Sequence, residues 1–468
     1  MQTEYKNFLL NVAYQILTYI FPIITIPYIS RVLGVDNIGI YSYTFSIVSM
    51  FLLFGMLGLN NYGNREIAKV RDNRAKTSKC FCSIYLLQIV VNVVSILSYL
   101  FYVYFICKEH TFIAKLQIIY LVSLLFDVNW FYFGLEKFKM TITRNLIIKV
   151  ISIVLIFLLI KDKNDLWIYT IIVAVATLLS QLYLFVNLPK FIDYTKVSYS
   201  QVKRHFKSVL LLFIPVLAYS IYRVMDKVMI GSISSMNELG NYENAEKLIN
   251  IPIAIITALG TVMLPRMSYL LANKGAEYKV VLLNSMNLIL LLSTIMAFGL
   301  FIISDEVSLI MFGNEFTKSG LIIKCITITV IISAWANVIR TQYIIPQGLD
   351  SIYIKSTIGG AVINLCSNLV FIQFYGAIGA CVGTVLAELF VMMYQSLKCR
   401  LHLELKKYTI LLLKYSFHSL CTILVAVFAA SFVDDVIGKL CIKIFVSVLI
   451  FFFLEREFIV YNFFGRKR

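Results

Sequence analysis

Charged side chains inside apolar stretches are the residues of this sequence that could carry chemistry. Arg223, Asp226 and Lys227 occur at positions i, i+3 and i+4 of one such stretch, and this spacing places all three on one face of a helix. A charge at the centre of a bilayer costs about 2.5–3.5 kcal/mol unless it meets water or a partner. We therefore expect this face to border a hydrated cavity.

The following apolar stretch repeats this spacing with the opposite balance of sign, at Glu243, Glu246 and Lys247. One interpretation is structural, because ion pairs between the two triplets would hold two adjacent helix ends together. The other is functional. Arg223, Lys227 and Lys247 would meet an anionic head group, while the carboxylates of both triplets set their protonation or serve as a gate. Both interpretations can hold together.

Other charges stand alone in their apolar stretches. Arg340 has no acid in its own stretch, so it is either a cation of the cavity or a side chain that snorkels to the membrane surface. Asp127 and Glu388 are isolated acids, each of which could bind a proton or sodium ion or form a hydrogen bond between helices. Lys324 and Lys414 lie near the ends of their stretches and are expected to snorkel.

Motifs typical of soluble enzymes are missing from the sequence. Residues 313–319 imitate a phosphate-binding loop, but Thr317 stands where the second glycine belongs. The four histidines are scattered without metal-ligand spacing, and the nine cysteines include no CxxC pair. We expect no catalytic residue, no metal and no organic cofactor, and leave a coupling ion, H⁺ or Na⁺, open.

The composition predicts an all-α polytopic membrane protein. Of 468 residues, 60% are hydrophobic and 14% are charged, whereas soluble domains have roughly 45–50% apolar and 25% charged residues. Spans of roughly 20 residues leave too little chain for a sizeable soluble domain. The net charge of +17 is assigned to membrane topology and not to nucleic-acid binding.

Apolar stretches predict fourteen spans, and the first is expected to be retained because it is longer than a signal-peptide core. The longest outer connection is expected at 304–317. The spans lie near residues 8–30, 38–60, 80–107, 116–135, 145–160, 167–188, 208–230, 241–264, 280–303, 318–345, 356–374, 377–398, 409–431 and 440–460.

Lysine and arginine are strongly biased toward alternate connections. The connection 61–79 has six of them and 189–207 has five, whereas 231–240 has none. Because basic connections stay in the cytoplasm, both termini are predicted to be cytoplasmic.

Two pairs of segments resemble each other at a distance of six spans. Residues 134–136 are similar to 348–350, and residues 38–41 to 239–242. An even offset gives both copies the same membrane orientation, as in transporters built from parallel repeats. We therefore predict a six-helix bundle at 1–190, a second one at 191–400, and two additional helices at 401–468.

The sequence resembles the polysaccharide-repeat flippases, the Wzx-type O-antigen and capsule flippases of the multidrug/oligosaccharidyl-lipid/polysaccharide exporter superfamily. The similarity runs from about Asn7 to Arg400. The segments that carry it are Pro27–Gly34, Gly39–Tyr41, Asn64–Ala68, Asp127–Trp130, Gly134–Phe138, Asp226–Lys227, Gly260–Arg266, Phe312–Gly313, Tyr375–Ala377 and Gly379–Ala380.

The resemblance implies a transporter and not an enzyme. It would move an undecaprenyl-pyrophosphate-linked oligosaccharide across the bacterial cytoplasmic membrane by alternating access, for capsule, exopolysaccharide or O-antigen. Its partners would be this lipid-linked oligosaccharide, membrane lipids, and a polysaccharide polymerase with its chain-length machinery. The pyrophosphate would meet cavity cations, which by position are Arg223, Lys227 and Arg340.

Two other functions of the same superfamily remain open at this point. A multidrug exporter is expected to carry an unpaired carboxylate in its first bundle, and Asp127 keeps that alternative in consideration. A flippase for the peptidoglycan precursor is the second alternative. The short outer connections argue against a membrane polymerase or glycosyltransferase, which would need a larger folded loop.

Overall fold

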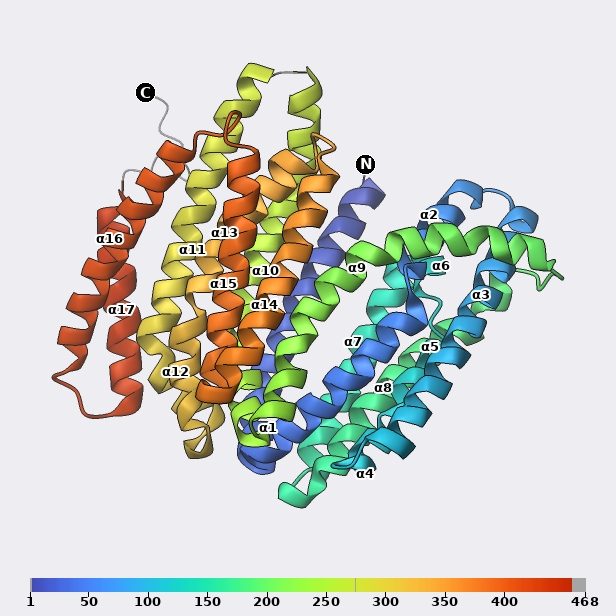
Figure 1. The fold of residues 1–468 in the computed structure, drawn as a ribbon, viewed down its shortest axis with the longest axis horizontal. Helices are drawn as coiled ribbons and strands as arrows, with labels where there is room; N and C mark the ends of the chain where they lie inside the picture. The colour runs from blue at the N-terminus through green and yellow to red at the C-terminus, as the bar shows by residue number, and fades with distance from the viewer. Residues whose placement is uncertain (1, 274, 457–468) are drawn as a thin grey trace. The chain divides into compact units, whose positions relative to one another are not determined.

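The chain is almost entirely helical in a computed structural model that describes residues 2–273 and 275–456, in which no strand occurs. The side chains left outside the description belong to residues 2–22, 211, 212, 214–216, 218, 219, 221–223, 275 and 276. The helices divide into two compact units, Met1–Gly231 and Ser232–Arg468 (Figure 1). The predicted boundaries at 190 and 400 stay a prediction.

Unit 1 contains long helices interrupted by short ones. Its elements are α1 (Gln2–Met56), α2 (Leu59–Val70), α3 (Arg74–Phe101), η1 (Tyr102–Ile106), α4 (Thr111–Leu116), α5 (Ile118–Leu124), α6 (Asn129–Gly134), α7 (Phe138–Leu159), η2 (Lys163–Asp165), α8 (Leu166–Val186), η3 (Leu188–Lys190) and α9 (Tyr199–Ile233), whose last residues pass into unit 2.

Helix α1 covers the first predicted span and most of the second. It turns at Gly34, whose φ of 78° and ψ of 170° are non-helical. Glycine adopts positive φ without a steric penalty, so the chain changes direction here without a connecting loop. The fourth predicted span, in contrast, is divided into α4, α5 and α6.

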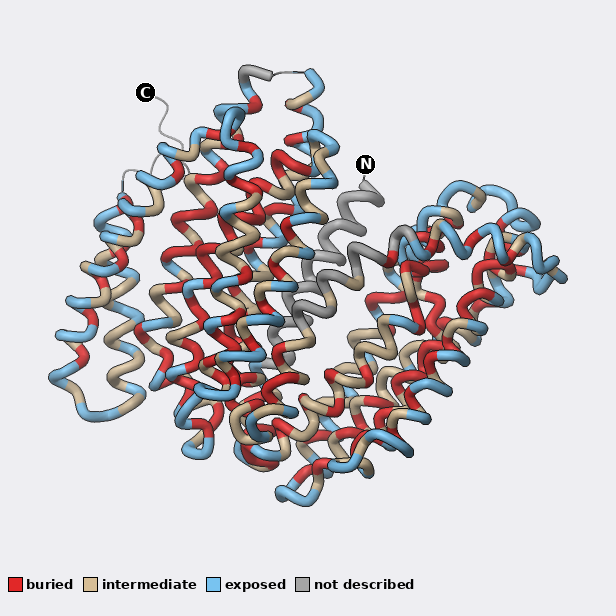
Figure 2. Tube along the Cα trace, in the orientation of Figure 1, coloured by how far each residue is buried: buried red, intermediate tan, exposed pale blue. Residues whose placement is uncertain are grey.

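The core of unit 1 is aromatic. Phe81, Trp130, Phe131 and Tyr132 are fully buried, and the Phe81 ring stacks on Trp130 at a centroid distance of 5.4 Å. A Cβ placed on Gly63 of α2 would lie 2.4 Å from the Trp130 ring, so glycine allows α2 to approach this core. Figure 2 shows the buried residues along the inner faces of the helices and exposed residues at their ends and outer faces.

Unit 2 is built from longer helices and two additional ones at its end. Its elements are α10 (Met236–Asn273), α11 (Gly275–Phe312), η4 (Asn314–Phe316), α12 (Thr317–Ile326), α13 (Ile328–Ile339), η5 (Arg340–Ile344), α14 (Asp350–Tyr375), α15 (Ala377–Lys398), α16 (Leu405–Ala430) and α17 (Val436–Leu454). Helices α16 and α17 pack on α11 and on each other (Figure 1).

The predicted outer connection at 304–317 is wrong. Helix α11 continues to Phe312, and only η4 separates it from α12. The polar residues that suggested a loop have partners on other helices, since Glu306 pairs with Lys443 and Asp305 with Lys324. These ion pairs allow a helix to continue through a charged stretch.

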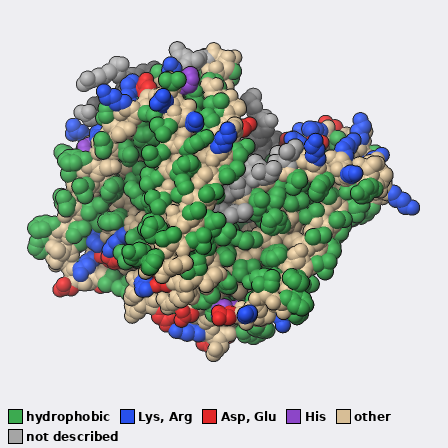
Figure 3. Space-filling model, in the orientation of Figure 1, with side chains coloured by type: hydrophobic (Ala, Val, Ile, Leu, Met, Phe, Trp, Pro, Cys, Tyr) green, Lys and Arg blue, Asp and Glu red, His purple; other side chains and the backbone are tan. Residues whose placement is uncertain are grey.

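Twelve helices within the described residues are long and apolar enough to cross a membrane. Large hydrophobic side chains are exposed along them, and they cover much of the surface in Figure 3. The predicted all-α, polytopic membrane fold is therefore confirmed. The total of fourteen spans and the repeat of six-helix bundles stay predictions.

The residue just before each of the two similar segments contacts the start of another helix in its own unit, as a donor in unit 1 and as an acceptor in unit 2. Asn37, just before residues 38–41, donates to the Lys163 carbonyl oxygen beside the start of α8 at 2.7 Å. Glu238, just before residues 239–242, accepts from the backbone N–H of Ala377 at the start of α15 at 3.0 Å.

Candidate functional site

Arg340 is the half-buried cation of unit 2 that lies at a break in helical geometry. It begins η5, a π-helical stretch that continues α13, and such stretches are frequent at functional sites. Its guanidinium lies 5.7 Å from the centre of the Tyr353 ring on α14. Within the described residues it has no acidic partner. Because the aromatic ring leaves the positive charge in place, Arg340 can meet an anion.

Buried amides lie on both sides of Arg340. The side-chain amide of Gln342 and the Oδ1 atom of Asn337 have no hydrogen-bond partner among the described residues. The Gln342 carbonyl oxygen accepts from the Tyr278 hydroxyl at 2.7 Å. Arg340 is thus flanked in the chain by two buried amide side chains, Asn337 and Gln342.

The triplet on α10 is paired along its own helix. Lys247 lies 3.3 Å from Glu243, one helical turn away, and both residues are half-buried. Glu246 is half-buried on the same helix and also has interaction partners. The charge of Lys247 is therefore offset by Glu243, which makes it a weaker candidate than Arg340 for an external anion.

The triplet on α9 is only partly described. The side chain of Arg223 lies outside the described residues. Asp226 is buried and Lys227 half-buried, and both have interaction partners. Which charge of α9 faces a ligand therefore stays a prediction.

Asp127 takes part in a hydrogen-bonded network inside unit 1. Its carboxylate accepts from the backbone N–H of Asn129 at 3.0 Å and from the Asn129 side chain at 2.7 Å. The same side chain donates to Gln181 of α8 at 3.0 Å. Glu388, the other isolated acid, is half-buried on α15 and has interaction partners.

Arg144 also belongs to this network. It was not predicted from the sequence, because it was assigned to a connection between two spans. It lies in α7 and is only 5% exposed. Its guanidinium donates to the Asn129 side chain at 3.1 Å and to the Ser180 carbonyl oxygen at 2.8 Å. The network thus joins α6, α7 and α8 and connects a buried cation to Asp127 through one amide. Four apolar or amide residues directly after Arg144 were the available signal that the helix had already begun.

His205 was also missed. It lies before the predicted span 208–230, is 3% exposed, and has a partner on each ring nitrogen. The Nδ1 atom lies 2.6 Å from the Tyr62 hydroxyl on α2, and Nε2 lies 2.9 Å from the Ser83 hydroxyl on α3. Burial, assisted by the neighbouring Arg204, lowers the pKa of His205 despite the opposing effect of Glu66.

Helices α16 and α17 take part in ion pairs whose carboxylates are largely buried. Lys443 donates to Glu306 of α11 at 2.6 Å. Glu455, at the end of α17, binds Lys414 at 3.0 Å and His418 at 2.5 Å. Lys414 and Lys324, which were expected to snorkel, each have an acidic partner, Glu455 and Asp305, and the snorkelling itself stays a prediction.

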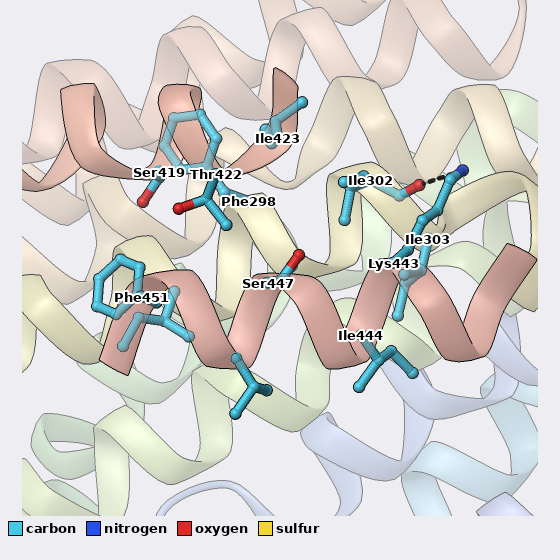
Figure 4. A pocket seen from close by; sticks show the side chains of 13 residues that line it. Phe298, Ile302, Ile303, Ser419, Thr422, Ile423, Lys443, Ile444, Ser447 and Phe451 are labelled. Carbon is cyan, nitrogen blue, oxygen red and sulfur yellow. Dashed lines mark hydrogen bonds between the residues drawn. The ribbon is translucent and has the colours of Figure 1, made fainter. Parts of the chain in front are cut away.

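A cavity of about 140 Å³ lies between α11, α16 and α17. Figure 4 shows Phe298, Ile302, Ile444 and Phe451 around it, and Lys443 turned to the Ile302 carbonyl oxygen. Its lining is almost entirely apolar. A cavity of this size holds a group comparable to benzene, so it does not fit a charged, sugar-bearing head group.

Comparison with known proteins gives one family match and several relatives of low sequence identity. Residues 5–271 match the family model described as polysaccharide biosynthesis protein. The chain is 23% identical over 413 residues to the protein named "Putative O-antigen transporter" of Shigella dysenteriae, and the match covers 83% of this chain and 98% of that protein.

Solved structures share the fold. The lipid II flippase MurJ in an inward closed conformation superposes with a TM-score of 0.77 at 17% identity, covering 97% of this chain and 99% of that chain. An inward-facing multidrug resistance MATE family transporter of the MOP superfamily superposes with a TM-score of 0.60 at 13% identity, covering 84% and 98%. These likenesses agree with the predicted all-α, polytopic membrane fold.

Proposed function

We propose that this chain, which belongs to the polysaccharide biosynthesis protein family, is a flippase for undecaprenyl-pyrophosphate-linked oligosaccharide repeat units. The observation that carries the proposal is the match to an O-antigen transporter across 98% of that protein's length. The product would be capsule, exopolysaccharide or O-antigen, made at the bacterial cytoplasmic membrane. A polymerase and its chain-length machinery would use the flipped repeat units.

Such a substrate requires a protein to cross the bilayer. Its pyrophosphate and sugar hydroxyls would lose their water in a hydrocarbon layer about 30 Å thick. A membrane protein that exposes polar groups by alternating access supplies replacement partners, while the lipid tail remains in the bilayer. No bond is made or broken in this step, so no catalytic residue is needed.

Arg340 is the residue of unit 2 best suited to meet the pyrophosphate. It is half-buried, carries no ion pair within the described part of the chain, and lies at the start of η5. Arg223 and Lys227 of α9 are the corresponding candidates on the other helix, and Lys247 is a weaker one because Glu243 pairs with it. Asp127, Asp226, Glu243, Glu246 and Glu388 stay candidates for gating, or for coupling to H⁺ or Na⁺.

Deletion of the gene tests the proposal. Undecaprenyl-linked repeat units should accumulate facing the cytoplasm, surface polysaccharide should be lost, and the intact gene should restore it. Deletion of the downstream polymerase is the control, because it should leave single repeat units exposed at the outer face. Normal delivery of repeat units to the outer face in the deletion strain would contradict the proposal.

The structural likeness to the lipid II flippase favours one second candidate, a flippase for the peptidoglycan precursor. That function predicts lysis or arrested wall synthesis on depletion, whereas the main proposal predicts growth with altered surface polysaccharide. The multidrug transporter has only its fold in common with this chain. A drug exporter would change drug susceptibility and leave the polysaccharide unaffected.

A further inference from the structure

The first turns of α9, residues 199–210, form a helix with two different faces, which we call the elbow helix. Val202, His205 and Val209 are buried on one side. Hydrogen bonds of His205 with the Tyr62 and Ser83 hydroxyls attach this side to α2 and α3 of unit 1. In Figure 1 these turns cross the end of unit 1 at which α2 and α6 lie. The buried side of the elbow helix is therefore fixed.

The other side of the elbow helix is exposed and combines positive charge with aromatic rings. Lys203, Arg204 and Lys207 are all exposed. Tyr199 is 79% and Phe206 is 45% exposed beside them. Within the described residues none of the three cations has an acidic partner, so their charge is available to an anion outside the chain.

Many cations of residues 61–79, the connection that contains α2, have acidic partners within unit 1. Lys69 binds Glu66 at 2.8 Å, and Arg74 binds Asp193 at 2.8 Å. The Arg74 guanidinium holds the pKa of the Asp193 carboxyl below its usual range. Figure 3 shows Lys and Arg side chains gathered at this end of unit 1. Unpaired charge next to exposed rings distinguishes the elbow helix from these paired cations.

We propose that the exposed side of the elbow helix binds the head groups of anionic phospholipids in the adjoining leaflet. The chain continues without a break from residue 210 into the apolar part of α9, so the elbow helix lies at the level where a span enters the bilayer. Lys and Arg attract anionic lipids at a membrane surface. Aromatic rings insert at the boundary between head groups and acyl chains.

An anionic lipid fits this surface better than a soluble acidic partner. A soluble acidic partner would bind the three cations but would leave the rings of Tyr199 and Phe206 exposed. A bilayer can bury these rings as well. Because lysine and arginine are concentrated in alternate connections, this end of unit 1 is predicted to lie on the cytoplasmic side. The lipid site is thus predicted in the cytoplasmic leaflet, and it does not depend on what the protein transports.

A tryptophan at position 206 reports on this contact. We would place the full-length Phe206→Trp chain in nanodiscs that contain the same fraction of brominated phosphatidylglycerol or of brominated phosphatidylcholine. The fluorescence difference from the parent chain isolates the new tryptophan from Trp130, Trp167 and Trp335. Quenching by the anionic lipid should exceed quenching by the zwitterionic lipid at least twofold.

Charge removal on the elbow helix should abolish this preference. Changing Lys203, Arg204 and Lys207 to Gln, or adding 0.5 M salt, should bring the quenching ratio close to one, because salt screens exposed charges. The matched control removes three other exposed cations at the same end, by changing Lys76, Lys139 and Lys79 to Gln, and should keep the preference.

Two outcomes would overturn the proposal. Equal quenching by both lipids in the Phe206→Trp chain would show that the helix does not select anionic head groups. A control variant that loses the preference to the same degree would show that net charge alone, and not the elbow helix, attracts the lipid. Retained melting temperatures of both triple variants establish that each comparison is made on folded protein.

Discussion

Lys443 of α17 donates to the Glu306 carboxylate of α11 at 2.6 Å, between two helices that cross the membrane. Lys443 also donates to the Ile302 carbonyl oxygen at 2.9 Å. The second carboxylate oxygen of Glu306 has no partner in the described part of the structure. This pair therefore holds α17 to α11 while leaving one oxygen of the acid unsatisfied.

Loss of one partner of this pair should destabilise the protein more than loss of both. Lys443→Met leaves a buried carboxylate unpaired, for which we expect a loss of about 3–5 kcal/mol. The double variant with Lys443→Met and Glu306→Met should be close to the parent. Melting temperatures of the purified chains in one detergent measure both. A double variant that melts as low as the single one would contradict this explanation.

Arg340→Ala should weaken the contact with the anionic head group by roughly tenfold and so reduce surface polysaccharide while the protein remains in the membrane. Arg340→Lys should retain part of the activity, since it keeps the charge but loses the planar contact with Tyr353. Immunoblots of membranes and quantification of the polysaccharide provide the two measurements. Lys355→Gln, an exposed cation on α14, is the control, and full activity of Arg340→Ala would remove Arg340 from the site.

Arg144→Met should destabilise unit 1, because it removes the donors to Asn129 and to the Ser180 carbonyl oxygen. We expect a loss of about 2–4 kcal/mol from unsatisfied buried acceptors. Asp127→Asn should have a smaller effect, since its amide oxygen can still accept from the Asn129 backbone. Thermal unfolding in detergent checks both. The reverse order of the two losses would mean that the carboxylate, and not the guanidinium, organises the network.

His205 should make stability depend on pH near neutrality. Its pKa is lowered in the folded chain by burial, so the unfolded chain binds the proton first. Stability is therefore greatest above the ordinary histidine pKa, about 6.5, and is lost as pH falls through that value toward the lower folded value. Melting curves between pH 5 and 8 should show this loss, and His205→Gln should reduce it. An unchanged pH dependence in His205→Gln would assign it to other groups.

Gly299→Ala should stabilise the chain by about 0.5–1 kcal/mol, because alanine is the better helix former. A Cβ at Gly299 meets no atom within 4 Å, since the residue lines the cavity beside α16 and α17. Gly383→Ala is the matched control. Its Cβ would lie 2.1 Å from the Asn368 side chain, and it should destabilise. A Gly299→Ala chain that melts no higher than the parent would contradict this expectation.

The features that could be predicted from sequence are those that depend on local composition. Apolar stretches indicated the membrane helices, and the charges within them identified Arg340 and Asp127 as exceptions that need an explanation. Pairing across long sequence distances could not be predicted. Glu306 and Lys443 are 137 residues apart, so residues 304–317 seemed a polar loop until their partners were known.

Local conformation explains the other differences. Gly34 and the residues around it could equally form a loop or a turn within a helix, and only the backbone angles distinguish the two. Arg144 looked like one more cytoplasmic cation, since burial of a guanidinium depends on acceptors from α6 and α8 that the local sequence does not reveal. The candidate site residues were thus chosen by residue type and stay a prediction, whereas their hydrogen-bond partners required the structure.

The turn at Gly34 joins two helical segments without any spare residue. Each residue of a helix rotates the following ones by about 100°. One inserted residue would therefore turn the face of α1 after Gly34 away from the helices it packs against, including α3 and α5. Leu33, Val35 and Ile38 beside the turn are buried, so homologous chains should keep apolar residues there and show neither insertions nor deletions across Gly34.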